Sequence, residues 1–273
     1  MTLLPTPIGN IEDITLRAIR VLEEADVLLC EDTRVAKKLL NLLSLRYSFK
    51  HNIKRFISLH SHNEEEIINL FNEDFFNQNV VYISDAGMPC ISDPGALLVK
   101  YCIENKIEYT VLPGASAFVT AYAGSGFLDS RFLFFGFLAH KGSKREKQLI
   151  SIINEKYPVI LYESPHRLKK LLDELENIIP KREIVAVKEI SKIYEQYFRG
   201  KATELKREIL KEHLKGEWVI IISPAKMDTV SSITVEDINA LNLPPKQKAK
   251  LLSKLTGRSV KECYLKLTNN QFI

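Results

Sequence analysis

Short apolar runs alternate with helical patterns up to about residue 124, and no other feature of the sequence limits the fold as strongly. The runs at residues 2–4, 27–30, 56–59, 80–83 and 109–112 are rich in β-branched, aromatic or other apolar side chains, as buried strands are. Helical patterns follow them, at residues 14–25, 35–43, 64–76, from 96 onward and at 118–124. Alternating strands and helices are typical of a mostly parallel sheet covered by helices, so we expect an α/β fold.

A second and less regular series begins after a pause at residues 124–131. Strands are expected at 132–138, 158–162, 183–187, 194–198 and 218–222, and helices at 168–178 and 203–214. Residues 224–232 are typical of a linker, and three short helices are expected at 235–241, 246–255 and 259–267. The sequence therefore predicts an N-terminal α/β domain at 1–114, a second α/β domain at 115–224, and a linker with a basic helical extension at 225–273.

Composition and charge narrow the class of protein. Among the 273 residues no apolar run has the length of a membrane span, so no membrane contact is expected. The four cysteines are scattered without a CxxC pair, which favours reduced thiols and a cytoplasmic location. Residues 244–266 hold seven Lys and Arg against one Glu, a density that indicates a polyanionic partner, although solvated surface lysines are the commoner explanation.

Several expected strands end in polar clusters, namely EDTR at 31–34, HSHN at 60–63, SDAG at 84–87, YESPHR at 162–167 and KEISK at 188–192. Each cluster alone is typical of an ordinary surface loop. In a parallel sheet, however, the carboxyl ends of the strands lie at one edge, where open α/β folds bind ligands. The clusters therefore predict a shared cleft. The sequence has no Walker loop, GxGxxG or GxSxG motif to define that cleft further.

Two histidines in one cluster have the spacing of a metal pair. His60 and His62 would face the same side of a strand, but no third ligand stands at a familiar spacing, so no metal is expected. A general base or a donor to phosphate suits them better. The pairs His166–Arg167 and Lys144–Arg145 are interpreted as anion contacts, because the Arg fork matches phosphate geometry.

The ordered motifs PTPIGNIEDITLRA, EDTR, HSHNE, SDAGMPCISDPG, LPGASA, GFL, YESPHR and KEISK closely resemble one family. It is the small-subunit ribosomal RNA (cytidine 2′-O) methyltransferase family of the tetrapyrrole-methylase-like, class III methyltransferases. The resemblance covers about residues 1–223. It implies two α/β domains, S-adenosylmethionine held between them, a homodimer, and a substrate cytidine ribose in the decoding region of 16S rRNA in the 30S subunit.

The resemblance also implies which residues bind the cofactor. PTPIG replaces the glycine-rich first loop of the wider superfamily, and SDAG stands where many relatives have Gly-Asp-Pro. Both motifs resemble those of the ribosomal branch. Carried over by motif, the expected cofactor contacts are Pro7, Ile8, Ser84, Asp85, Gly87, Met88, Ser116, Ala117, Tyr162 and Glu163.

Methyl transfer to a ribose hydroxyl requires alignment with the methyl donor and removal of the hydroxyl proton. The candidate catalytic residues on the cleft edge are Glu31, Asp32, His60, Lys188 and Glu189, and the sequence does not single out one base. The candidate RNA contacts are Arg34, His62, Lys144, Arg145, His166 and Arg167. Two alternatives stay open: a tetrapyrrole (precorrin-type) methyltransferase, and a non-catalytic RNA-binding assembly factor of the ribosome.

Overall fold

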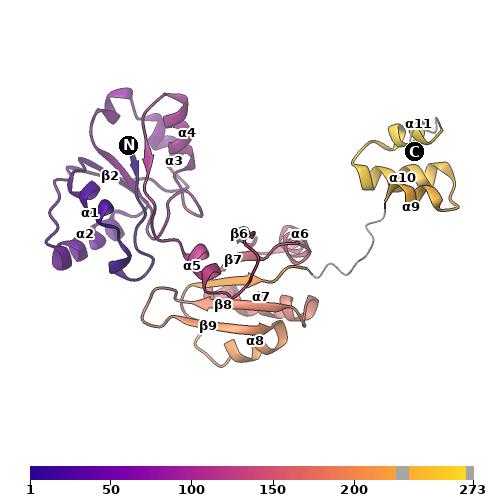
Figure 1. Ribbon diagram of the computed structural model, residues 1–273. Helices are drawn as coiled ribbons and strands as arrows, with labels where there is room; N and C mark the ends of the chain where they lie inside the picture. Colours follow the sequence, from indigo (N-terminus) through magenta and orange to yellow (C-terminus); the bar gives the residue numbers. More distant parts are fainter. Residues whose placement is uncertain (226–233, 269–273) are drawn as a thin grey trace. The chain divides into compact units, whose positions relative to one another are not determined.

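A computed structural model of the chain describes residues 1–225 and 234–268, with the side chain of Glu73 left out. The chain divides into two compact units, at residues 1–225 and 226–273, and each is considered by itself (Figure 1). The first unit contains two five-stranded sheets. No helix in the described ranges is long and apolar enough to cross a membrane.

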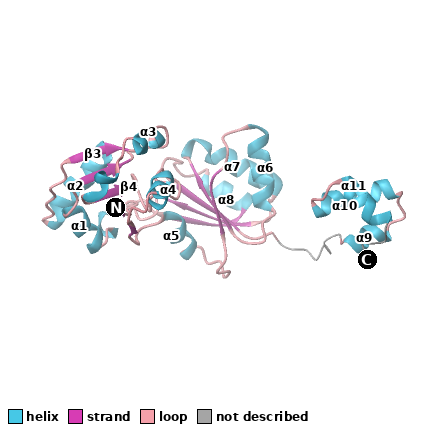
Figure 2. Cartoon of the chain, turned by 90° about the horizontal axis from the view of Figure 1, so that it is seen from above, coloured by secondary structure: helices cyan, strands magenta, loops and turns pink. Residues whose placement is uncertain are grey.

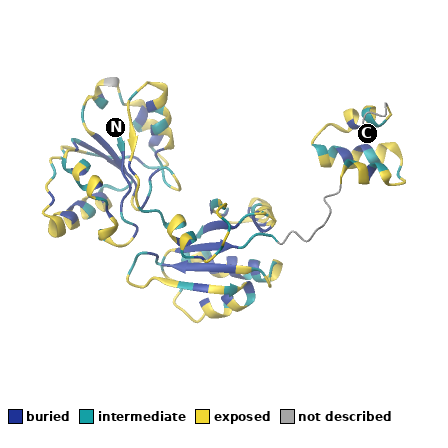
Figure 3. Cartoon of the chain, in the orientation of Figure 1, coloured by how far each residue is buried: buried dark blue, intermediate teal, exposed yellow. Residues whose placement is uncertain are grey.

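The first sheet is entirely parallel, as the alternating pattern predicts. Its strand order is β3-β2-β4-β1-β5, and every neighbouring pair runs in the same direction. The strands are β1 (Thr2–Leu3), β2 (Val27–Cys30), β3 (Arg55–Ser58), β4 (Val80–Ile83) and β5 (Thr110–Val111). The central strands β2 and β4 are buried along their whole length, which explains their uninterrupted apolar sequences (Figure 3).

Helices cover both faces of this sheet. On one face α1 (Leu16–Glu23) and α2 (Thr33–Tyr47) bury Leu22, Leu40 and Leu43. On the other face, α3 (Glu64–Asn69), the 3₁₀ turn η2 (Glu73–Asn77) and α4 (Ala96–Glu104) bury Ile68 and Leu98. The continuous helix expected at 64–76 is wrong: α3 ends at Asn69, and the Asn72 side chain accepts a hydrogen bond from the Phe75 N–H and starts η2.

The second sheet is mixed, with the order β6-β7-β10-β8-β9. Only β6 and β7 pair in parallel, whereas β10 runs antiparallel to both β7 and β8, and β9 runs antiparallel to β8. The strands are β6 (Leu133–Phe137), β7 (Val159–Glu163), β8 (Glu183–Lys188), β9 (Gln196–Lys201) and β10 (Trp218–Ile222). The strand expected at 194–198 therefore begins two residues later, because residues 189–195 form the loop between β8 and β9.

The helices of the second half also lie on both faces of their sheet (Figure 2). One face is covered by α6 (Gly142–Ile153), α7 (Pro165–Ile178) and α8 (Ala202–Ile209), and the other by α5 (Ala117–Ala123). The helix expected at 203–214 is too long, since α8 ends at Ile209. The core under α5 includes Ile8 from the first loop of the chain, which joins the two halves of the first unit.

The second unit is a small group of three helices, α9 (Val235–Ala240), α10 (Pro245–Thr256) and α11 (Val260–Thr268). They pack around a core of Ile238, Ala249, Leu252 and Cys263. The three predicted helices are therefore present. The linker expected at 224–232 lies mostly outside the described residues.

Candidate functional site

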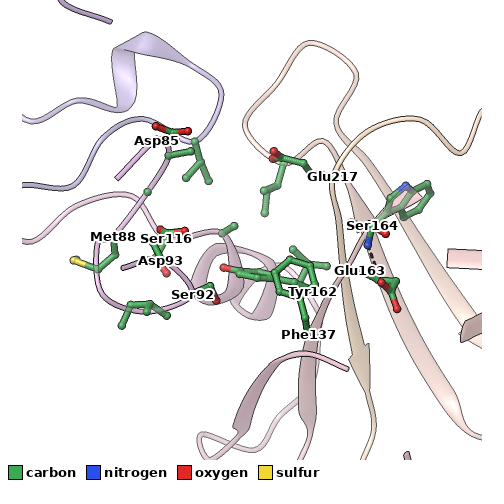
Figure 4. Close-up of a pocket in the computed structure, with 18 of the residues that line it drawn as sticks. Asp85, Met88, Ser92, Asp93, Ser116, Phe137, Tyr162, Glu163, Ser164 and Glu217 are labelled. Carbon is green, nitrogen blue, oxygen red and sulfur yellow. Dashed lines mark hydrogen bonds between the residues drawn. The ribbon is translucent and has the colours of Figure 1, made fainter. Parts of the chain in front are cut away.

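A cavity of about 390 Å³ lies between the edges of the two sheets, within the first unit (Figure 4). This volume is in the range of about 300–1,000 Å³ that is usual for small-molecule sites. The first half contributes Ile8 and the loop after β4, and the second half contributes the start of α5 and the ends of β6, β7, β8 and β10. The lining residues are Ile8, Asp85, Ala86, Gly87, Met88, Ile91, Ser92, Asp93, Ser116, Ala117, Phe137, Tyr162, Glu163, Ser164, Pro165, Ile190, Glu217, Trp218 and Val219.

The loop after β4 is fixed against the first loop of the chain. Thr6 and Gly87 exchange two backbone hydrogen bonds of 3.0 Å, and the buried Ser84 hydroxyl donates to the Gly87 carbonyl oxygen at 3.3 Å. Gly87 has a φ of +81°, and a Cβ there would lie 3.1 Å from the Ile8 side chain. Glycine meets both the left-handed conformation and the close contact without strain, and the loop presents Ile8 and Asp85 to the cavity.

Three partly buried carboxylates gather on this side. Burial raises the pKa of Asp85, of Asp93 and of Glu31 above the ordinary values, and the charge on Asp85 raises the pKa of the other two further. Asp85 accepts a hydrogen bond of 3.1 Å from the Asp32 N–H, which connects the cavity to the EDTR cluster. A cationic ligand would favour the ionised form of all three carboxylates.

The opposite wall is aromatic and apolar. The Tyr162 hydroxyl accepts a hydrogen bond of 3.2 Å from the Phe118 N–H in the first turn of α5, and burial raises the pKa of Tyr162 to about 12. The Tyr162 and Phe137 rings lie 5.6 Å apart. The two rings are inclined by 60° to each other, and with Ile190 and Ile8 they offer apolar contacts to a planar heterocycle.

Glu163 occupies the edge of the cavity, but its carboxylate is already engaged. One oxygen accepts hydrogen bonds from the Ser164 N–H at 2.9 Å (Figure 4) and pairs with the Arg167 guanidinium at 2.8 Å. The other lies 3.8 Å from the Arg145 guanidinium and accepts no hydrogen bond from the described residues. The Glu163 side chain is buried, and the positive charges of Arg145 and Arg167 compensate its negative charge.

Eight of the ten residues predicted to bind the cofactor line the cavity. The two that do not are Pro7 and Ser84, which lie beside lining residues in the same two loops. Ser84 is 1 % exposed, and its hydroxyl bonds within the loop after β4. The predicted binding role of all ten stays a prediction.

None of the five predicted catalytic residues lines the cavity. Glu31 and Asp32 lie next to it, through their contacts with Asp85. Lys188 is buried and donates to the His213 carbonyl oxygen at 2.6 Å. Glu189 accepts hydrogen bonds from the Glu217 N–H at 2.7 Å and from Lys192 at 2.9 Å, which places it beside the cavity residue Glu217.

His60 lies at the end of β3, the edge strand of the first sheet. Its backbone N–H donates to the Asn63 side chain, and its ring lies 6.1 Å from that of His62. Within residues 1–225 and 234–268, no group of three or more His, Cys, Asp and Glu side chains is arranged to hold a metal ion.

The six predicted RNA contacts differ in exposure. The Arg34 side chain is 88 % exposed and pairs with Asp32 at 2.6 Å, and His62, Lys144 and His166 are exposed. Arg167 is half-buried against Glu163 and the Phe137 ring. The Arg145 side chain is 2 % exposed and pairs with Glu174 at 2.7 Å, so it has no surface to offer an RNA phosphate.

Sequence reasoning missed eleven lining residues, most of them in the second half. Glu217, Trp218 and Val219 reach the cavity because β10 is antiparallel to β7 and β8, so its amino end lies where those strands finish. The polar clusters that predict the cleft all lie at the carboxyl ends of expected strands. No local pattern marks this antiparallel pairing, so the sequence offers no signal for these three residues.

Comparison with known proteins defines the class. A family model described as Tetrapyrrole (Corrin/Porphyrin) Methylases matches residues 1–206. The solved structure of uroporphyrin-III C-methyltransferase from Thermus thermophilus, complexed with S-adenyl homocysteine, has a TM-score of 0.55 at 18% identity, and the match covers 81% of this chain and 95% of that one. The fold and the sequence match therefore define a methylase with the tetrapyrrole-methylase fold.

Closer relatives define the branch. A protein of Campylobacter fetus subsp. fetus named "Ribosomal RNA small subunit methyltransferase I" is 43% identical over 265 residues, which cover 97% of this chain and 98% of that one. A Thermotoga maritima protein of the same name is 39% identical over 224 residues, 82% of this chain and 97% of that one. The chain thus belongs to the ribosomal RNA small subunit methyltransferase I family of the tetrapyrrole methylases.

The cavity fits S-adenosylmethionine, the methyl donor implied by the sequence resemblance. Its volume suits a ligand of that size. Asp85 and Asp93 offer carboxylates to a ligand with an ammonium group and a sulfonium, and Phe137 and Tyr162 offer an apolar face to an adenine ring.

Proposed function

We propose that this chain transfers the methyl group of S-adenosylmethionine to the ribose 2′-hydroxyl of a cytidine in the decoding region of 16S rRNA, within the 30S subunit. The observation that carries the proposal is an acid-edged cavity of ligand size in a chain whose relatives of the same length are named as ribosomal RNA small subunit methyltransferases. The tetrapyrrole enzymes share the fold at low sequence identity, and this likeness bears on the fold alone.

The loop after β4 and the start of α5 would hold the cofactor. Asp85 would pair with its ammonium group, and the Tyr162 and Phe137 rings would pack against its adenine. When bound, S-adenosylmethionine supplies an electrophilic methyl group. The contribution of the chain is to align the acceptor hydroxyl with that methyl group and to exclude water from it.

The EDTR cluster supplies the best candidate for the proton acceptor. Hydrogen bonds from Arg34 lower the pKa of Asp32 to about 2, which makes its carboxylate a weak base. Burial raises the pKa of Glu31, so its carboxylate holds a proton more strongly than Asp32 does. Of the five predicted catalytic residues, Glu31 is therefore the one we propose as the base.

The cations Arg34, Lys144 and Arg167, with His62 and His166, are proposed as contacts for RNA phosphates, and Arg145 is left out because of its burial. We also propose a homodimer, a cytoplasmic location, and the domain boundaries 1–114, 115–224 and 225–273. The two sheets support these boundaries, since the first uses strands up to Val111 and the second begins at Leu133.

The proposal is tested by incubating the protein with radiolabelled S-adenosylmethionine and 30S subunits that lack the modification. Free 16S rRNA and a tetrapyrrole serve as parallel acceptors. Label recovered from 30S subunits as alkali-stable 2′-O-methylcytidine is the expected result. Label in the tetrapyrrole alone would overturn the substrate, and RNA binding without any transfer would favour an assembly factor.

A further inference from the structure

The net positive charge of the chain is concentrated in its C-terminal helices. Residues 1–225 contain 30 Lys and Arg against 30 Asp and Glu, whereas residues 234–268 contain seven against three. The first unit, which holds the whole cavity, is therefore formally neutral, and the C-terminal helices account for the net charge of +4. A concentration of charge in so small a unit points to a polyanionic partner.

Two of the three carboxylates in residues 234–268 are used within the helices themselves. Asp237 accepts hydrogen bonds from the Thr234 N–H and hydroxyl at the start of α9, and Glu262 accepts from the Ser259 N–H and hydroxyl at the start of α11. Both are capping contacts, which stabilise the helix ends. Asp237 and Glu262 therefore do not pair with the lysines of α10.

Three of those lysines form one row. Lys246, Lys250 and Lys254 recur every four residues of α10, which puts them on one face at steps of about 6 Å along the helix axis. All three are exposed, and none pairs with a carboxylate in the two ranges that the structure describes. The opposite face of α10 buries Ala249 and Leu252, so the row points away from the small core.

This unit is separable from the methyl-transfer machinery. All residues that line the cavity lie between Ile8 and Val219. The Thermotoga maritima relative matches 224 residues of this chain over 97% of its own length, which leaves no room in it for a second unit of this size. The C-terminal helices therefore accompany a methyltransferase whose cavity is complete without them.

We propose that the row Lys246–Lys250–Lys254 on α10 binds phosphates of the RNA substrate, as a docking site separate from the cavity. The inference rests on the proposed function for the identity of the RNA. Phosphate contacts of this kind add affinity without reading sequence, so the row acts on substrate capture and not on the chemical step.

The test is a full-length triple variant, K246Q/K250Q/K254Q. Its matched control is K169Q/K181Q/K211Q, which removes three exposed lysines of the first unit and leaves the same net charge. Affinity for an unmodified 16S rRNA transcript is measured between about 50 and 200 mM salt. Each phosphate contact contributes about 0.7–0.9 to the slope of log affinity against log salt, so the slope should fall by about two to three in the test variant.

Four further readouts separate the possible outcomes. The turnover rate at saturating RNA and the affinity for S-adenosylhomocysteine should match those of the wild type, while the KM for RNA rises about tenfold or more. Equal salt slopes in the test and control variants would overturn the proposal. A changed sedimentation coefficient with unchanged RNA affinity would also overturn it, because α10 would then contact a second copy of the chain.

Failure of the proposed function would look different. If the wild-type protein methylates no RNA, the substrate assignment fails, yet the salt slopes still report whether the α10 row binds RNA phosphates. If the test and control variants have equal salt slopes and the wild-type protein methylates RNA normally, only the docking site is rejected.

Discussion

Asp85 connects the cavity with the EDTR cluster. Its carboxylate lines the cavity and accepts the Asp32 N–H, and it raises the pKa of both Glu31 and Asp93. Asp32 in turn caps α2 and pairs with the exposed Arg34. A change in charge at Asp85 therefore affects ligand binding and the neighbouring carboxylates together.

Asp85→Asn should weaken binding of S-adenosylhomocysteine. The amide keeps the shape of the side chain but loses the charge that would pair with the ligand's ammonium group. A hydrogen bond to a charged group contributes about 1.5–3 kcal/mol, or roughly 10- to 150-fold in affinity. Isothermal titration calorimetry measures the effect. Asp129→Asn, which removes a carboxylate paired with Arg131 outside the cavity, is the control and should bind normally.

The same carboxylate should make ligand affinity depend on pH. Burial raises the pKa of Asp85, so its proton returns at a higher pH than for an ordinary aspartate. Protonation removes the negative charge, and affinity for S-adenosylhomocysteine should fall as the pH is lowered from 7 toward about 4. Asp85→Asn should have a flatter profile, with the remaining slope due to Glu31 and Asp93. A wild-type affinity that rises on acidification would contradict this assignment.

At the scale of the element, an ion pair of the buried Arg145 joins α6 to α7. The Arg145 guanidinium binds Glu174 and donates to the Ala139 carbonyl oxygen at 3.0 Å, with Glu163 nearby. Arg145→Met would remove the cation nearest to Glu174 and one of the two arginines that balance the charge of the buried Glu163. The expected loss is about 3–5 kcal/mol in the free energy of unfolding, measured by urea denaturation. The exposed neighbour Lys144 is the control, and Lys144→Met should change stability by no more than about 0.5 kcal/mol.

The start of α4 depends on one glycine. Gly95 has a φ of +118°, and a Cβ there would lie 2.4 Å from the Tyr82 ring and 2.6 Å from the Cys90 sulfur. Gly95→Ala should therefore cost about 1–3 kcal/mol for crowding, in addition to the strain of the backbone. Gly126→Ala provides the comparison, since Gly126 has a φ of +82° with no atom within 4 Å. Equal losses in the two variants would show that crowding at Gly95 is absent.

The elements also explain which parts of the molecule the sequence could predict. The parallel sheet and the loop at 84–87 follow from runs such as VVYI and from the polar residues after them, because both are local patterns. The mixed direction of the second sheet depends on long-range pairing, so the place of Glu217 at the cavity could not be inferred. The burial of Arg145 likewise depends on Glu174, 29 residues away, and no local pattern marks it.

At the scale of the whole molecule, the C-terminal helices should be dispensable for cofactor binding. A chain that ends at Ala225 retains every residue that lines the cavity and all four core clusters of the first unit. Its affinity for S-adenosylhomocysteine, measured by calorimetry, should stay within about twofold of that of the full chain. A loss of tenfold or more would mean that the second unit contributes to the site.

The cavity also has a consequence for how the protein is made. Its walls use residues from Ile8 to Val219, so no shorter N-terminal fragment contains the complete binding site. At about 5–20 residues per second, synthesis of that length takes on the order of 10–45 seconds. During this interval the first sheet has time to fold on the translating ribosome, but ligand cannot stabilise it. The growing chain must therefore include Val219 before the methyl donor can bind the complete site and stabilise the fold.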